Sequence, residues 1–365
     1  MEYLPYIITG LIGFGGIAFF ALMAVFVERK IAAYIQDRVG PNVVGPYGLF
    51  QTFADILKLL MKEQIIPDAV DRRLFVLAPI IVFISVFAGF AVIPWGAGNS
   101  AISLSASLVF VIAIVSVEVI GMWMAGWSSN NKYSLLGAIR AIAQMVSYEI
   151  PVALALLSAV VLVGSLDLNE ICRLQGIHGI PPTSWGGIFA WNIFKYPHLI
   201  LAFMIYAIAS LAECNRAPFD LPEAESEIIA GFHTEYSGFR FALFMLAEYS
   251  NMLLVSLLGV IVFWGGWNSP FPDISFNSAA GEGIVSTNSL LQWGKLTTGI
   301  PGTWSGNIWG TFWLLSKATL WVLVQMWIRW TFPRIRVDQL MSLCWKVFVP
   351  AGIGLVLLSG LIKIL

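Results

Sequence analysis

The sequence predicts an all-helical integral membrane protein with about eight transmembrane helices. Of its 365 residues, 58% are hydrophobic and only 11% are charged, whereas about a quarter of the residues in a soluble domain are charged. A soluble fold of this length needs more polar surface to cover its core. Its long apolar runs also lack the alternation that a transmembrane barrel requires, so helices are the expected spanning elements.

Eight apolar stretches approach or exceed the roughly 20 residues with which a helix crosses a bilayer. The fifth is the weakest, because it is short and ends in polar residues. Together they predict a single polytopic membrane domain over residues 1–365. We place the spans near 4–27, 74–95, 102–127, 136–164, 197–214, 240–265, 308–328 and 344–364.

The positions of Lys and Arg predict the orientation of the chain. The loops after the first, third, fifth and seventh spans carry most of the 20 basic residues, and the loops on the opposite side carry few. We therefore expect the first set of loops to face the cytoplasm and both termini to face away from it. The predicted cytoplasmic loops are 28–73, 128–135, 215–239 and 329–343.

Within the first cytoplasmic loop, residues 49–63 predict an amphipathic helix. Apolar residues such as Leu49 and Phe53 share one face, and Asp55 and Lys58 lie on another. Such a helix lies in the membrane interface rather than across the bilayer. It could be a brace at the membrane surface or one wall of an entry for an amphipathic ligand, and the pattern leaves both open.

The third cytoplasmic loop, residues 215–239, is unusually acidic, and we call it the acidic loop. Asp220 and Glu223 have the spacing of a capping box, and Pro222 suits a first helical turn. A solvated acidic surface is one interpretation. Because crowded carboxylates take up protons readily, a site that gains and loses charge is the other. The acids of this loop are Asp220, Glu223, Glu225, Glu227 and Glu235.

Four glutamates lie inside predicted spans, where a charge costs a few kcal/mol unless it is paired, protonated or hydrated. A rise of ~1.5 Å per residue places Glu118, Glu149 and Glu248 at depths of ~12–13 Å and Glu213 at ~5 Å. One buried glutamate often only joins two helices, but four at stepped depths beneath an acidic loop predict a proton relay. Lys317, also within a span, could pair with one of them or titrate itself.

No metal or redox-cofactor site is indicated by the sequence. The three cysteines and three histidines are scattered and match no disulfide, zinc, iron–sulfur or haem spacing. The glycines at 13–16 lack the GxGxxG spacing and follow no strand, so helix packing explains them better than dinucleotide binding. The net charge of −1 gives no indication of a nucleic-acid partner.

Four long motifs lie on the predicted cytoplasmic loops, in this order: ERKIAAYIQDRVGPNVVGPYGLFQTFADILKLLMKE (28–63), KYSLLGAIRAIAQMVSYEI (132–150), AECNRAPFDLPEAESEIIAGFHTEY (212–236) and WIRWTFPRIRVDQL (327–340). With the eight-span topology, they closely resemble the quinone-channel membrane subunit of respiratory complex I, the proton-pumping NADH:quinone oxidoreductase. Members of this family are numbered 1 or lettered H among the subunits of the complex. The long outer loops, 165–196 and 266–307, depart from its pattern and leave assembly contacts open.

The resemblance implies a subunit that encloses much of a quinone tunnel where the hydrophilic arm docks. The chain would bind no redox cofactor, and FMN and iron–sulfur clusters would belong to partner subunits. Other partners would be antiporter-like membrane subunits, quinone and membrane lipid. The tunnel and hinge elements map onto Arg29, Arg38, Asp55, Arg216, Phe219 and the acidic loop, including Asp220 and Glu235. The buried-carboxylate pathway maps onto Glu118, Glu149, Glu213, Glu223, Glu225, Glu227 and Glu248.

Two other classes of function remain open from the sequence. A stand-alone ion transporter would use buried carboxylates, but it rarely needs two long amphiphilic loops of this composition. A homologous membrane subunit of an energy-converting hydrogenase would share the glutamates, with weaker matches in the first loop and the acidic loop. The expected location is a bacterial cytoplasmic membrane or, alternatively, a mitochondrial inner membrane.

Overall fold

The computed structural model describes residues 4–96, 100–176, 187–221, 229–271 and 304–365. All the secondary-structure elements in these ranges are helices, which confirms the predicted fold class. Three acids of the acidic loop, Glu223, Glu225 and Glu227, lie outside the described residues.

Six of the described helices are long and apolar enough to cross a membrane, as an integral membrane protein requires. α8 (His198–Glu213) is a shorter apolar helix and corresponds to the weak fifth span. α1 (Leu4–Ile35), 32 residues long, covers the first predicted span. The six long helices are α3 with η2 (Arg72–Val92), α4 (Ser107–Ser128), α5 (Lys132–Val163), α10 (Gly238–Phe263), α12 (Trp304–Thr331) and the last helix (Val337–Ile364).

The last helix begins earlier than the predicted span at 344–364. α13 (Val337–Leu343) continues through a π-helical turn, η5 (Cys344–Phe348), into α14 (Val349–Ile364). Residues 337–343, predicted as loop, are therefore the first turns of this helix. The amphipathic helix predicted at 49–63 is α2 (Gln51–Met61), which follows the short η1 (Pro46–Gly48).

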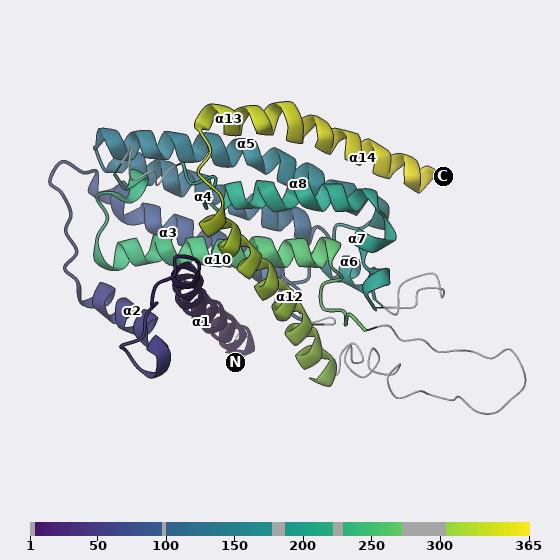
Figure 1. The fold of residues 1–365 in the computed structure, drawn as a ribbon, viewed down its shortest axis with the longest axis horizontal. Helices are drawn as coiled ribbons and strands as arrows, with labels where there is room; N and C mark the ends of the chain where they lie inside the picture. Colours follow the sequence, from purple (N-terminus) through teal and green to yellow (C-terminus); the bar gives the residue numbers. More distant parts are fainter. Residues whose placement is uncertain (1–3, 97–99, 177–186, 222–228, 272–303) are drawn as a thin grey trace, which may run out of the picture.

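Most of the long helices run side by side along the longest axis of the molecule, and α1 and α12 lie obliquely to them (Figure 1). α4 packs between α3 and α5, α5 also contacts α8 and α14, and α10 contacts α1, α3 and α12. Of the six long helices, α10 is the most enclosed: 89% of the residues in its apolar segment are buried, against 22% in that of the last helix. It therefore forms the centre of the bundle.

Glycines on α4 allow the close packing of α3, α4 and α5. A Cβ added at Gly121 would lie 2.4 Å from Val82 Cγ2, and one added at Gly126 would lie 2.2 Å from Ala138 Cβ. Small residues let membrane helices approach closely where van der Waals contacts drive association. This packing fixes the relative positions of the helices that carry two of the candidate glutamates.

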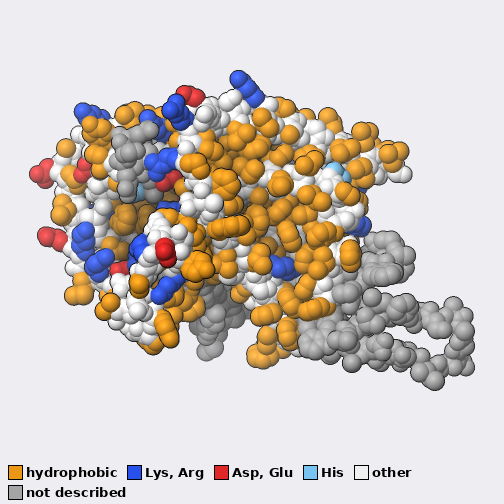
Figure 2. Space-filling model, in the orientation of Figure 1, with side chains coloured by type: hydrophobic (Ala, Val, Ile, Leu, Met, Phe, Trp, Pro, Cys, Tyr) orange, Lys and Arg blue, Asp and Glu red, His pale blue; other side chains and the backbone are white. Residues whose placement is uncertain are grey.

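The two ends of the bundle differ in composition. One end holds α2, η4 (Gly231–His233) of the acidic loop and the start of α5, and we call it the charged end. The far end holds α6 (Leu168–Leu174), η3 (Gly187–Ala190) and α7 (Asn192–Lys195) (Figure 1). On the face shown in Figure 2, charged side chains gather at the charged end and hydrophobic ones cover the middle.

Candidate functional site

Arg216, in the acidic loop just after α8, lies in a buried cluster between acids of two helices. Its Nη1 donates to both carboxylate oxygens of Glu28, at 2.9 and 2.8 Å, and its Nε lies 2.6 Å from Glu248 Oε1. The guanidinium also lies 4.2 Å from the centre of the Tyr249 ring. Arg216 is only 2% exposed. Two carboxylates thus share one buried cation.

Burial and charge act in opposite directions on Arg216. Burial lowers the pKa of the guanidinium, but Glu248, Tyr249 and Glu28 together outweigh it and raise this pKa well above its ordinary value. Arg216 therefore keeps its charge. Any change of charge in the cluster must then fall on the acids around it.

Glu28, on α1, contacts three other parts of the chain in this cluster. Besides the Arg216 contacts, it accepts a hydrogen bond from the Tyr249 hydroxyl at 2.7 Å and is paired with Arg329 of α12. It is 4% exposed. Glu28 was not among the residues predicted from the sequence, although it lies within the first-loop motif. In the sequence, its importance is indicated by its position directly after a long apolar run.

Arg29 and Asp55, both selected from the sequence, form an ion pair between α1 and α2. Gln51 Nε2 donates to Asp55 Oδ1 at 3.3 Å, and Lys58 Nζ lies 3.6 Å from the same atom. Partial burial raises the pKa of Asp55, but the hydrogen bond and charge of Arg29 outweigh this and hold the pKa below its ordinary value. The pair therefore attaches α2 to the end of α1. Arg38 is exposed and contacts Gln36 instead.

The first part of the acidic loop is anchored to α5 and to the segment before α13. Phe219 is buried, with its ring 5.9 Å from that of Tyr148. Asp220 Oδ2 lies 3.1 Å from Arg334 Nη2. Gln144 Nε2, which the sequence analysis missed, donates to the carbonyls of Ala212 and Phe219, both at 2.7 Å. One amide on α5 therefore fixes both the end of α8 and the turn that follows Arg216.

The last part of the acidic loop packs on the start of α5. Glu235 accepts a hydrogen bond from Asn131 Nδ2 at 2.7 Å, and the Ser134 hydroxyl donates to the carbonyl of Phe232 at 3.0 Å. His233 is buried, and this burial lowers the pKa of its imidazole to about 4. The imidazole is therefore neutral at physiological pH.

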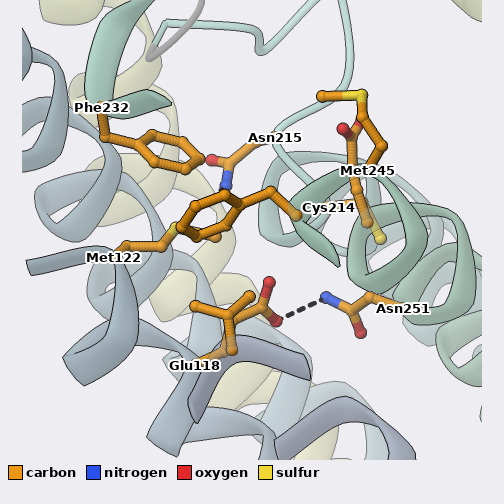
Figure 3. A pocket seen from close by; sticks show the side chains of 10 residues that line it. Glu118, Met122, Cys214, Asn215, Phe232, Met245 and Asn251 are labelled. Atoms are coloured by element: carbon orange, nitrogen blue, oxygen red, sulfur yellow. Dashed lines mark hydrogen bonds between the residues drawn. The ribbon is translucent and has the colours of Figure 1, made fainter. Parts of the chain in front are cut away.

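Each of the four glutamates inside the spans lies on a different helix. Glu118 of α4 is 3% exposed and accepts a hydrogen bond from Asn251 Nδ2 of α10 at 3.1 Å (Figure 3). Glu149 of α5 accepts one from the Ser116 hydroxyl. Glu213 is the last residue of α8, and Glu248 lies on α10 beside Arg216.

Electrostatic interactions connect these acids into a row. Glu118 interacts with both Glu213 and Glu248, and Glu213 also interacts with Glu149. The order of neighbours is therefore Glu248, Glu118, Glu213, Glu149. We call these four the glutamate row. Its first member, Glu248, also belongs to the Arg216 cluster.

Lys317 of α12 contacts none of the four glutamates. Its Nζ donates to the backbone carbonyls of Trp264 and Asn268, both at 2.9 Å, and lies 4.5 Å from the centre of the Trp191 ring. Of the two possibilities left open by the sequence, pairing with a glutamate is therefore wrong. In the ranges that the structure describes, no group of three or more His, Cys, Asp and Glu could hold a metal ion.

Comparison with known proteins identifies the family of this chain. The family model described as NADH dehydrogenase matches residues 8–360. The chain is 49% identical over 361 residues to the NADH-quinone oxidoreductase H 2 subunit of Cytophaga hutchinsonii, an alignment that covers 94% of this chain and 95% of that protein. The chain belongs to the H-subunit family of the NADH-quinone oxidoreductases.

Two further relatives support this membership. The NADH-quinone oxidoreductase H subunit of Chlorobium luteolum is 49% identical over 92% of this chain and 82% of its own length. The corresponding H 2 subunit of Solibacter usitatus is 40% identical over 100% of this chain and 97% of its own length. The resemblance found in the sequence motifs is confirmed, and the chain is a membrane subunit of an NADH-quinone oxidoreductase complex.

Proposed function

We propose that this membrane subunit encloses part of a quinone tunnel at the charged end and couples quinone reduction to proton translocation through the glutamate row. The observation that carries the proposal is that Glu248 belongs both to the Arg216 cluster and to the glutamate row. It is paired with Arg216 in the cluster that joins α1, the acidic loop, α10 and α12, and it is a neighbour of Glu118. A change of charge beside the acidic loop can thus reach carboxylates inside the bundle.

The first loop supplies the amphiphilic wall that a quinone needs. A quinone has a polar ring and an apolar tail, so its path must offer both kinds of surface. α2 presents exposed Phe53 and Leu57 on one side and the Arg29–Asp55 pair on another. A helix of this kind lies in the membrane interface, where an apolar tail could enter. This favours the entry wall over the simple brace.

Reduction of the quinone to the quinol takes up two electrons and two protons. The electrons come from iron–sulfur clusters that we assign, with FMN, to hydrophilic partner subunits, so this chain contributes no redox cofactor. We assign the uptake of protons to the acids of the acidic loop, among which the sequence selected Glu223, Glu225 and Glu227. When Glu248 gains a proton, its attraction to Arg216 weakens, and Arg216 can then bind more strongly to Glu28.

The glutamate row carries this change away from the tunnel. A carboxylate inside the bilayer is costly unless it is paired, protonated or hydrated, so adjacent acids avoid carrying charge at the same time. Protonation of Glu248 therefore favours ionisation of Glu118, and the alternation continues through Glu213 to Glu149. From Glu149 the proton would pass to antiporter-like membrane subunits.

Gln variants of two members of the row test this proposal. Glu149→Gln and Glu213→Gln keep the size of the side chain but cannot accept or release a proton, so we expect proton translocation by the complex to fall by roughly 10²-fold. The measurement is proton translocation per NADH oxidised, in proteoliposomes. Glu170→Gln is the matched control, because Glu170 lies at the far end in an exposed pair with Arg173. Normal stoichiometry and rate in both row variants would disprove the relay.

A further inference from the structure

We infer that Asn251 is a positioning residue of the glutamate row: its amide holds Glu118 in both the charged and the neutral state and, with Glu248, binds one water molecule between the two acids. This inference rests on the proposed relay. Glu118 and Glu248 are the members that would exchange protons, and Asn251 is the side chain that contacts one and shares a helix face with the other.

Asn251 lies between the two acids. It follows Glu248 by three residues on α10, and residues at this spacing share a helix face. Its Nδ2 reaches across to Glu118 Oε2 on α4, at 3.1 Å, and the side chain is 2% exposed (Figure 3). All three residues line the same small cavity. The amide is therefore fixed where the row passes from α10 to α4.

Among the described residues, the other end of this amide has no hydrogen-bond partner. Asn251 Oδ1 is buried, and no hydrogen-bond donor reaches it from the part of the chain that the structure describes. Leaving a buried polar atom without a partner destabilises the folded protein. Such an atom in a native protein calls for an explanation, which can be functional. Here it is an acceptor beside a group that must gain and lose a proton.

The two ends of an amide match the two states of a carboxyl group. An ionised carboxylate only accepts hydrogen bonds, and a neutral carboxyl group also has one O–H to donate. Asn251 Nδ2 donates to the ionised Glu118, and Oδ1 can accept from its neutral form after half a turn about the last side-chain bond. An apolar side chain could serve neither state, and a lysine could serve only the first.

The cavity beside Asn251 completes the connection to Glu248. Its volume is about 20 Å³, and a water molecule needs about 10–15 Å³ and two to four polar partners. Glu118, Glu248 and Asn251 supply those partners, the amide of Asn215 also lines the cavity, and Met122, Met245 and other apolar side chains close the remaining walls. One water there would join the acids without opening a wider path between them.

Substitution of Asn251 in the intact complex tests this inference. Asn251→Leu keeps the size of the side chain and removes both polar ends, so we expect roughly tenfold slower proton translocation at a given rate of NADH oxidation. Asn251→Ser keeps one group that both donates and accepts, and we expect it to recover part of the loss. Infrared difference spectra supply a second measurement. The carbonyl stretch of neutral Glu118, assigned by its absence in Glu118→Gln, should move to higher wavenumber in Asn251→Leu.

The outcomes separate this inference from the relay itself. If Glu118→Gln translocates protons normally, the relay is wrong. The proposed role of Asn251, which depends on the relay, is then wrong too. If Glu118→Gln is impaired while Asn251→Leu translocates normally with an unshifted carbonyl band, the relay stands and the role of Asn251 is overturned. If Asn251→Leu does not assemble, the Ser variant and its carbonyl band decide: a reduced rate together with a shifted band supports the inference, and a normal rate contradicts it.

Discussion

Two cations lie beside α10, one buried and one half-buried, and they are held by different chemistry. Near the start of the helix, Arg216 is bound by the carboxylates of Glu28 and Glu248. Past its other end, Lys317 is bound by the backbone carbonyls of Trp264 and Asn268. Both contacts satisfy a charge that would be costly in isolation.

This difference indicates which end can respond to chemistry. A carboxylate can gain a proton, so the number of charges around Arg216 can change during turnover. A carbonyl oxygen cannot, and the carbonyls at a helix C-terminus attract a cation in any state of the protein. We therefore propose that proton coupling occurs around Arg216 and that Lys317, which could respond only by losing its own proton, has a structural role. The substitutions below would break or sharpen this assignment.

The largest effect is expected at Arg216. Arg216→Met leaves Glu28 and Glu248 buried without their shared cation, and breaking a buried ion pair in this way costs about 3–5 kcal/mol. We expect a large fall in the thermal stability of the complex and loss of NADH:quinone activity. Arg216→Lys, which keeps the charge but not the geometry of the guanidinium, should lie between this variant and the wild type. A stable and fully active Met variant would show that the cluster is dispensable.

A smaller and purely structural effect is expected at Lys317. Lys317→Met keeps much of the apolar chain and removes the two hydrogen bonds to carbonyls, which should reduce stability by about 1–3 kcal/mol. Thermal unfolding of the purified complex should show this loss, while the number of protons translocated per NADH stays normal. A lower stoichiometry at unchanged stability would contradict the assignment and place Lys317 in the proton path.

The sequence predicted features that depend on local patterns. Long apolar runs predicted the spanning helices, and the periodicity around Phe53 and Asp55 predicted α2, because length and helical spacing are properties of a single segment. The last helix was predicted too short, since a π-helical turn joins α13 to α14. The four glutamates were visible because an acid is conspicuous in an apolar span.

Features that depend on packing between segments were not predicted. Glu28 matters because Arg216, Tyr249 and Arg329 come to it from three other parts of the chain. Gln144 and Asn251 are single amides in apolar helices, and their importance lies in partners more than 60 residues away. No pattern along one segment distinguishes such an amide from an ordinary polar residue.

A double variant tests most directly whether the glutamate row acts in series. Glu248 and Glu149 are its two ends, and in a series pathway either substitution by Gln already interrupts transfer. The account predicts that Glu248→Gln with Glu149→Gln lowers proton translocation per NADH no further than the more severe single variant. Effects that instead multiply, as expected for independent sites, would contradict transfer through one continuous row.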